Sequence, residues 1–233
     1  MVINRHKSDP RYRRKRNNLT VNNSAKKIYL VACGGHGRVV LDALQANKKQ
    51  IEGIIDSQLE VDSEIFGVKV MGDDRFLETL DPKNLILVNG LGSTGSTRER
   101  IKIFERFTAN GFKFEGVIHP AASIGAECKI SISAQIMAGA VLQNRVDVGE
   151  NVVVNTRASI DHDVVLADHV VVSPGAIISG AVKVHRGAFV GAGAVIIQGI
   201  EVGEFCTIGA GAVVRHHVKP NSTVVGNPAA QLE

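Results

Sequence analysis

A strict six-residue repeat of branched aliphatic side chains runs through the second half of this chain. Between positions 118 and 214, seventeen successive positions spaced six apart hold only Ile, Val or Leu. A fixed period of six residues is typical of a parallel β-helix, in which each repeat supplies one short strand and one corner. The column consists of Ile118, Ile124, Ile130, Ile136, Leu142, Val148, Val154, Ile160, Leu166, Val172, Ile178, Val184, Val190, Ile196, Val202, Ile208 and Val214.

A second column of smaller residues supports this geometry. Ala, Val or Cys stands two residues before nearly every large aliphatic, as at Ala134 and Ala158. Residues two apart on a strand share a face, so each strand should turn one small and one large side chain inward. Three strands then close a triangular coil, and stacked coils bury a continuous core. We expect glycine after the large residue to give the corner backbone freedom, at Gly125, Gly149, Gly191, Gly203 and Gly209.

The residues before the repeat predict a different architecture. Strands are expected at 28–32, 51–55 and 85–89, and helices over 38–46, around 73–80 and over 96–110. Alternating strands and helices indicate a small parallel sheet with helices on both faces. We therefore predict four segments: a basic tail (1–27), an α/β domain (28–115), a β-helix (116–220) and a C-terminal extension (221–233).

Basic residues are concentrated in the tail. It carries nine Lys or Arg against Asp9 alone, a net charge of +8, so the rest of the chain has a net charge of −4. A polybasic arm can contact anionic lipid or nucleic acid, but the composition is also that of a disordered leader. The tail lacks the apolar segment of a secretory signal, and no stretch approaches the ~20 apolar residues of a membrane span. We predict no membrane span and no nucleic-acid partner.

The cysteine count bears on the compartment. Three cysteines are an odd number and have no metal-ligand spacing with histidine. They indicate reduced thiols in a cytoplasmic protein and no zinc site.

A glycine-rich turn follows the first predicted strand and begins the first helix. Gly34, Gly35 and Gly37 form most of a phosphate-binding pattern, in which backbone N–H groups approach a phosphate at the helix N-terminus. Ala32 replaces the usual first glycine, and Asp56 stands where an acidic residue would meet a ribose hydroxyl. A plain structural turn is the alternative interpretation. The half-size sheet argues against a dinucleotide redox cofactor and favours a nucleotide that carries another group.

His162 differs from the other histidines because acidic residues flank it on both sides, Asp161 and Asp163. It follows the inward Ile160 by two positions, so it should project from a corner. An adjacent carboxylate holds one imidazole tautomer and supports proton abstraction, as a general base requires. One coil later, Gly180 has no side chain, and this predicts a groove for a long thin substrate. The histidines expected to be ordinary surface residues are His119, His169, His185, His216 and His217.

Four segments taken together resemble the bacterial sugar acetyltransferases of the PglD and NeuD type. They are residues 34–40 (GGHGRVV), 155–163 (NTRASIDHD), 173–176 (SPGA) and 225–229 (VGNPA). The likeness covers nearly everything from residue 28 onward. It implies a small Rossmann-like α/β domain that binds a sugar nucleotide, followed by a left-handed parallel β-helix of hexapeptide repeats that binds acetyl-CoA. It also implies a homotrimer with active sites at the subunit interfaces.

The resemblance implies roles for individual residues. His162 matches the general base, Asp163 the residue that increases its basicity, and Asn155 a residue near the acceptor. Val171 stands where some members have histidine. Contacts to the sugar nucleotide are implied at Gly34, Gly35, His36, Asp56, Ser57 and Gly90. Contacts to acetyl-CoA are implied at Val171, Gly180, Ala192 and Ala210.

The implied reaction is direct acetyl transfer, with no acyl-enzyme and no metal. The acceptor would be the amino group of a nucleotide-linked sugar, such as a UDP- or GDP-linked 4-amino-4,6-dideoxy sugar, in surface-glycan synthesis. Two alternatives remain open. The loop over residues 91–98 favours an O-acetyltransferase of a sialic-acid-like sugar, and a third hypothesis is a non-catalytic partner that stabilises a sugar-biosynthetic enzyme.

Overall fold

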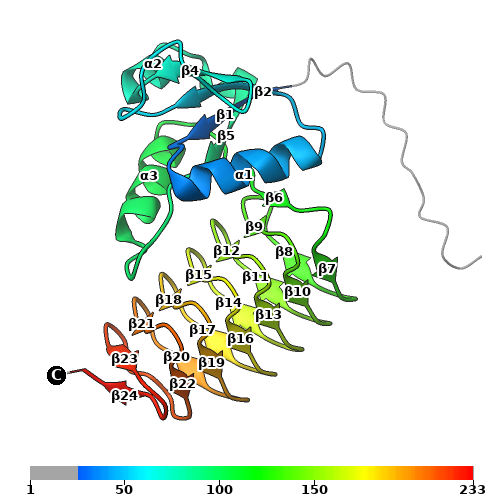
Figure 1. Ribbon diagram of the computed structural model, residues 1–233, viewed down its shortest axis with the longest axis vertical. Coiled ribbons are helices and arrows are strands. Elements are labelled where there is room, and N and C mark those ends of the chain that lie inside the picture. Colours follow the sequence, from blue (N-terminus) through cyan, green and yellow to red (C-terminus); the bar gives the residue numbers. More distant parts are fainter. Residues whose placement is uncertain (1–25, 233) are drawn as a thin grey trace, which may run out of the picture.

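The computed structural model describes residues 26–232, so the predictions for the basic tail lie almost entirely outside the described residues. An α/β unit stands at one end of a long coil of short strands (Figure 1). No helix in the described part of the chain is long and apolar enough to cross a membrane.

The α/β unit is a five-stranded sheet in the order β3-β4-β2-β1-β5, parallel except for β3. Side chains of α1 pack on one face of the sheet, and those of α2 and α3 pack on the other, which confirms the prediction of a sheet with helices on both faces. The strand β4 was not predicted, because exposed Lys69 interrupts its apolar run. The elements are β1 (Lys27–Val31), α1 (Gly35–Ala46), β2 (Ile51–Ile55), β3 (Glu64–Ile65), β4 (Val68–Gly72), α2 (Asp74–Glu78), a 3-10 helix (Pro82–Asn84), β5 (Leu85–Asn89) and α3 (Arg98–Ala109).

The repeat forms a parallel β-helix with three faces, as predicted. Face one contains β6 (Val117–Ile118), β9 (Gln135–Ile136), β12 (Val153–Val154), β15 (Val171–Val172), β18 (Phe189–Val190), β21 (Thr207–Ile208), β23 (Thr223–Val225) and β24 (Ala230–Gln231). Face two contains β7 (Ser123–Ile124), β10 (Val141–Leu142), β13 (Ser159–Ile160), β16 (Ile177–Ile178), β19 (Val195–Ile196) and β22 (Val213–Val214). Face three contains β8 (Lys129–Ile130), β11 (Asp147–Val148), β14 (Val165–Leu166), β17 (Lys183–Val184) and β20 (Glu201–Val202).

Stacking in this coil is in register at eighteen residues, so that Leu142 pairs with Ile160 and Ile160 with Ile178. From Ile136 onward, every member of the large aliphatic column is at most 2% exposed. Ile118 and Ile124 are exposed because they lie in the first coil, at the end of the stack.

The glycines after the large residues serve close packing rather than backbone freedom, which corrects the expectation for Gly125, Gly149, Gly191, Gly203 and Gly209. None of the five has a positive φ. A Cβ on Gly191 would lie 2.6 Å from the backbone nitrogen of Ala210 in the next coil, and the other four would meet similar obstructions. The left-handed corner residue instead comes two positions later, and there the chain often uses a residue other than glycine, such as Asp163.

The α/β unit is attached to face one of the coil by α1 and by α3 with its preceding loop (Figure 1). Met137 of the coil packs in the core beneath α1. Thr97, at the start of α3, donates to the carbonyl of Gly187 at 2.7 Å, and Thr207 donates to the carbonyl of Gly95 at 2.7 Å. The glycine turn is therefore held in a defined position against the coil.

A chain of hydrogen bonds crosses this junction, and we call its five members the junction chain. His36 Nε2 bonds Gln135 Oε1 at 3.0 Å, and Gln135 Nε2 donates to the carbonyl of Asn89 at 2.7 Å. Asn89 Nδ2 donates to Asn151 Oδ1 at 3.2 Å, and Asn151 Nδ2 lies 3.1 Å from His169 Nδ1. His169 is only 4% exposed and packs edge-on against Phe104, so the expectation that it lies on the surface is wrong. The helix α3 covers it, and the repeat pattern carries no sign of that helix.

The two side chains of β14 provide a test of strand orientation. Leu166 points inward and is 1% exposed, whereas neighbouring Val165 points outward and is 39% exposed. Leu166→Ala should lower the free energy of unfolding by about 2–5 kcal/mol because it leaves a cavity in the core. Val165→Ala should change it by less than about 1 kcal/mol. Denaturant unfolding followed by circular dichroism measures both, and equal losses would contradict the assigned orientation.

The junction chain predicts that acid weakens the fold. Burial lowers the pKa of both His36 and His169 from 6.5 to about 4, and a nearby charge acts in the same direction, mainly that of Arg100 at His36 and that of Arg186 at His169. Between about pH 4 and pH 6.5 these histidines bind more protons in the unfolded chain than in the folded one. The free energy of unfolding should therefore fall as the pH drops from 6.5 toward 4. At pH 5 the loss should be about 1–2 kcal/mol per histidine.

Urea unfolding at pH 7 and pH 5 measures this loss in the wild type and in His169→Gln. The glutamine keeps an acceptor for Asn151 but does not titrate, so the variant should lose less stability on acidification. An identical pH dependence in the two proteins would assign the acid sensitivity to other groups.

Candidate active site

The glycine turn leaves the N-terminus of α1 open. Its N-cap, Gly34, makes no side-chain cap, and no acidic residue stands in the first turn. The first N–H groups of a helix have no partner within it, so this end can accept an anion. Ala32, in place of the usual first glycine, has a positive φ of 66°. A Cβ on Gly37 or Gly90 would lie 2.3 or 2.1 Å from the Ala32 carbonyl oxygen, so the turn and the end of β5 must both be glycine to fit together.

A first cavity of about 410 Å³ lies beside this turn, between the ends of β1 and β2. Gly34, Asp56 and Ser57 line it, as does Arg38. The Asp56 carboxylate accepts from the backbone nitrogens of Cys33 at 2.7 Å and Gln58 at 2.8 Å, which holds it against the turn. The structure thus gathers the predicted nucleoside contacts around one cavity.

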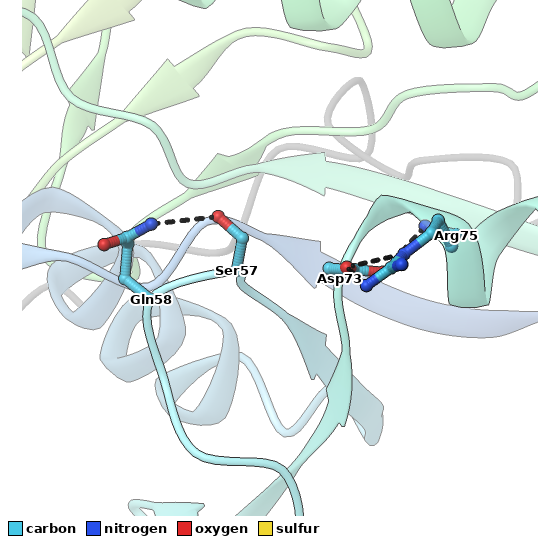
Figure 2. A network of polar contacts seen from close by, with 4 residues as sticks. All are labelled: Ser57, Gln58, Asp73 and Arg75. Carbon is cyan, nitrogen blue, oxygen red and sulfur yellow. Dashed lines mark hydrogen bonds and ion pairs between the residues drawn. The ribbon is translucent and has the colours of Figure 1, made fainter.

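The loop after β2 is fixed further by side chains. Figure 2 shows Ser57 and Gln58 on this loop, joined by a bond from Gln58 Nε2 to the Ser57 hydroxyl at 3.3 Å. Where α2 begins, Asp73 caps the helix and pairs with Arg75 at 2.6 Å, so the charge of Arg75 is already neutralised (Figure 2). Arg75 is not among the residues that line the first cavity, and Arg38 is the basic residue that lines it.

A second cavity of about 370 Å³, here called the junction cavity, lies between the α/β unit and face one of the coil. The glycine turn contributes Gly35 and His36, and the coil contributes Asn155 and Val171. Leu91 lines both cavities, so the two adjoin. Residues far apart in sequence, predicted for acceptor and for acetyl-CoA contacts, meet here.

Arg100 is a residue of the junction cavity that the sequence interpretation missed. It is 1% exposed, and its Nη1 donates to the carbonyls of Asn89 at 2.9 Å and Leu91 at 2.7 Å. Its Nε and Nη2 have no hydrogen-bond partner within residues 26–232. Burial lowers the pKa of this guanidinium to about 9. Its spacing in the sequence indicates this burial, because Arg100 lies on the same apolar stripe of α3 as Phe104 and Phe107.

His162 projects from the corner after face two, where it meets Asp163 and Arg145. Its Nδ1 lies 2.8 Å from Asp163 Oδ2, and Arg145 Nη2 lies 2.6 Å from Asp163 Oδ1. Hydrogen bonds from His162 first, and then from Arg145, hold the pKa of Asp163 below its usual range, so the carboxylate stays ionised. Because an ionised carboxylate only accepts, Nδ1 is the donor in this contact, and Nε2 is the ring nitrogen that the pair does not use.

Stacking places the neighbours of this histidine. Arg145 stands eighteen residues before Asp163, one coil away, and this stacking rule could have predicted their contact. A Cβ on Gly180, one coil after His162, would lie 2.7 Å from the imidazole Cε1 and Nε2. The predicted gap is thus the space that the imidazole itself needs.

Within one chain the predicted site residues fall into two groups on the coil. Asn155 follows β12 of face one, as Ala192 follows β18 and Ala210 follows β21. His162 follows β13 of face two, and Gly180 follows β16. Face two lies between the corner of the Asn155 group and the corner of the His162 group. The lining of the junction cavity accordingly does not include His162.

Both parts of the chain match models of known protein families. Residues 27–107 match the family model of the PglD N-terminal domain, and residues 181–216 match that of the bacterial transferase hexapeptide.

Solved structures resemble the chain over most of its length. The acetyltransferase domain of PglB from Neisseria gonorrhoeae is 34% identical, with a TM-score of 0.83 over 89% of this chain and 100% of that one. The same domain in complex with acetyl coenzyme A is 33% identical, with a TM-score of 0.80 over 89% and 99%. A variant of perosamine N-acetyltransferase from Caulobacter crescentus, in complex with CoA and GDP-perosamine, is 28% identical, with a TM-score of 0.83 over 89% and 97%. The chain therefore belongs to the hexapeptide-repeat sugar acetyltransferases of the PglD and NeuD type.

Proposed function

We propose that this protein transfers the acetyl group of acetyl-CoA to the amino group of a nucleotide-linked amino sugar. The observation that carries the proposal is the His162–Asp163 pair, which engages Nδ1 and leaves Nε2 outside the pair, at an exposed corner of the coil. A relative with this fold is a perosamine N-acetyltransferase in complex with CoA and GDP-perosamine, and a closer one is in complex with acetyl coenzyme A.

The two adjoining cavities suit a nucleotide-linked acceptor. Its nucleoside would lie in the first cavity against Asp56 and Ser57, and its diphosphate over the open N-terminus of α1 at Gly34 and Gly35. The sugar would then enter the junction cavity near Asn155. Cavities of ~300–1,000 Å³ are typical of small-ligand sites, and both lie in that range.

The coil residues supply the proton transfer. The acceptor nitrogen attacks the thioester carbonyl while His162 Nε2 removes its proton, and Asp163 stabilises the resulting imidazolium. The C–S bond then breaks, and the CoA thiolate takes the proton back from His162. Arg145 orients the carboxylate from the previous coil. The CoA arm would run along the corners at Gly180, Ala192 and Ala210.

The division of the site over two corners supports a homotrimer, in which His162 of one subunit reaches the acceptor held by its neighbour. Face two presents an apolar surface suited to that contact. Ile177 is 46% exposed there, and Val141, Val195 and Val213 are half-buried. Face three carries mostly charged outward residues instead, among them Lys129, Asp147, Lys183 and Glu201.

Thiol release from acetyl-CoA, measured against a panel of amino-sugar nucleotides and sialic-type sugars, tests the reaction. His162→Ala should lower kcat roughly 10²–10⁴-fold, the usual contribution of a positioned general base. His185→Ala is the matched control, because the side chain of His185 is also 44% exposed on the coil, whereas no carboxylate adjoins it in sequence and Glu201 lies 3.9 Å away, at Nε2. Release with hydroxyl acceptors alone would instead assign O-acetylation, and unchanged activity in His162→Ala would exclude this base.

Co-expression of two inactive variants tests the shared site. His162→Ala and Asn155→Ala should each be inactive alone, because each damages one of the two corners. In mixed trimers, about a quarter of the sites would combine an intact His162 with an intact Asn155 from the neighbour, and activity should return to that fraction of wild type. Failure of the mixture to exceed the single variants would place both residues in one subunit's site.

A further inference from the structure

The junction cavity contains a buried positive charge that no residue described in the structure neutralises. Among the described residues, the buried side-chain nitrogen and oxygen atoms without a hydrogen-bond partner are Ser93 Oγ and Arg100 Nε and Nη2. Both residues line the junction cavity. An isolated buried charge is far more costly than a paired one, so these orphaned groups require a physical account.

The groups around Arg100 do not supply a negative charge. Its Nη1 contacts are two backbone carbonyls, and no Asp or Glu is among the residues that line the junction cavity. His36, which lines the same cavity, and His169 on the coil are neutral at physiological pH. The nearby Asn151 and Gln135 are uncharged amides of the junction chain.

A second source of positive potential points to the same place. The N-terminus of the twelve-residue helix α1 opens at Gly35, which lines this cavity, and the first turn of the helix contains no acidic residue. The end of α1, which has no side-chain cap, and the unpaired guanidinium of α3 therefore both adjoin the junction cavity. The free Nε–Nη2 edge is the edge of a guanidinium that binds two oxygens of one oxyanion in parallel.

We propose that Arg100 and Ser93 form an anion subsite that binds an oxyanion carried by the acceptor. Arg100 supplies two parallel N–H donors, and the Ser93 hydroxyl supplies a third. The ligand is called the acceptor on the strength of the proposed function, whereas the subsite itself follows from the cavity. A phosphate of a nucleotide-linked sugar and the carboxylate of an acidic sugar share the required chemistry.

Calorimetric binding without acetyl-CoA tests the subsite in the full-length protein. The probes are UDP, GDP and inorganic phosphate in one arm, and N-acetylneuraminate in the other. Arg100→Gln should weaken binding of the recognised probe roughly ten- to hundredfold, and Ser93→Ala roughly two- to tenfold. Lys102→Gln removes one positive charge from an exposed position of the same helix and should leave binding unchanged.

The two arms distinguish the sources of the anion. Binding of the nucleoside diphosphates that depends on Arg100 assigns the subsite to phosphate, and dependence confined to N-acetylneuraminate assigns it to a sugar carboxylate. Thermal unfolding checks that Arg100→Gln folds. If it does not fold, Arg100→Lys and Ser93→Ala replace it as the test variants. Lysine keeps the positive charge but lacks the two parallel N–H donors of the guanidinium, so Arg100→Lys should bind the recognised probe with an intermediate affinity.

Unchanged affinity of every probe for a folded Arg100→Gln would overturn the proposal, as would the absence of binding to the wild type. Failure here is distinguishable from failure of the proposed function, because no acetyl donor is present and His162 is intact. Acetyl transfer that survives the loss of Arg100 with an unchanged KM for the acceptor would overturn the subsite alone.

Discussion

The eighteen-residue stacking register of the coil determines where every other feature of this protein can lie. Each large inward side chain stacks on another large aliphatic side chain eighteen residues away, so the core extends along the axis of the coil. For the same reason, each corner residue has a fixed neighbour in the coil before it and in the coil after it. Arg145 reaches Asp163 through this register, and Gly180 leaves room for the imidazole of His162 in the same way. A shift of one residue would turn the aliphatic column to solvent and separate all four residues.

The α/β unit depends on the same register, because its contacts are made to successive coils. The junction chain runs from His36 through Gln135 in one coil to Asn151 and His169 in later ones. A buried polar chain of this kind is stable only when each member is satisfied, and it therefore specifies one orientation of the α/β unit on face one. That orientation brings the open end of α1 beside the coil and forms the junction cavity.

Periodic features were predictable from the sequence. The inward columns, the parallel sheet and the corner position of His162 all follow from spacing, since each repeats or alternates at a known period. The contacts of α3 were not predictable in this way, because a helix that covers a β-helix face leaves no periodic mark on that face. The repeat pattern therefore predicts a surface position for His169, although Phe104 of α3 covers it. Arg100 was overlooked for the complementary reason: a charge on an amphipathic helix is normally solvated, and only its alignment with Phe104 and Phe107 shows otherwise.

The proposed anion subsite and the proposed base make opposite electrostatic demands, and the fold separates them. An oxyanion is bound best by an unpaired cation, and the junction cavity provides Arg100 without a carboxylate among its lining residues. A general base must become positively charged as the reaction proceeds, so a free cation beside it would oppose catalysis. At His162 the neighbouring cation, Arg145, is paired with the carboxylate that supports the imidazole. One face of the coil lies between these environments within a chain, and a neighbouring subunit would bring them to the two ends of one acceptor.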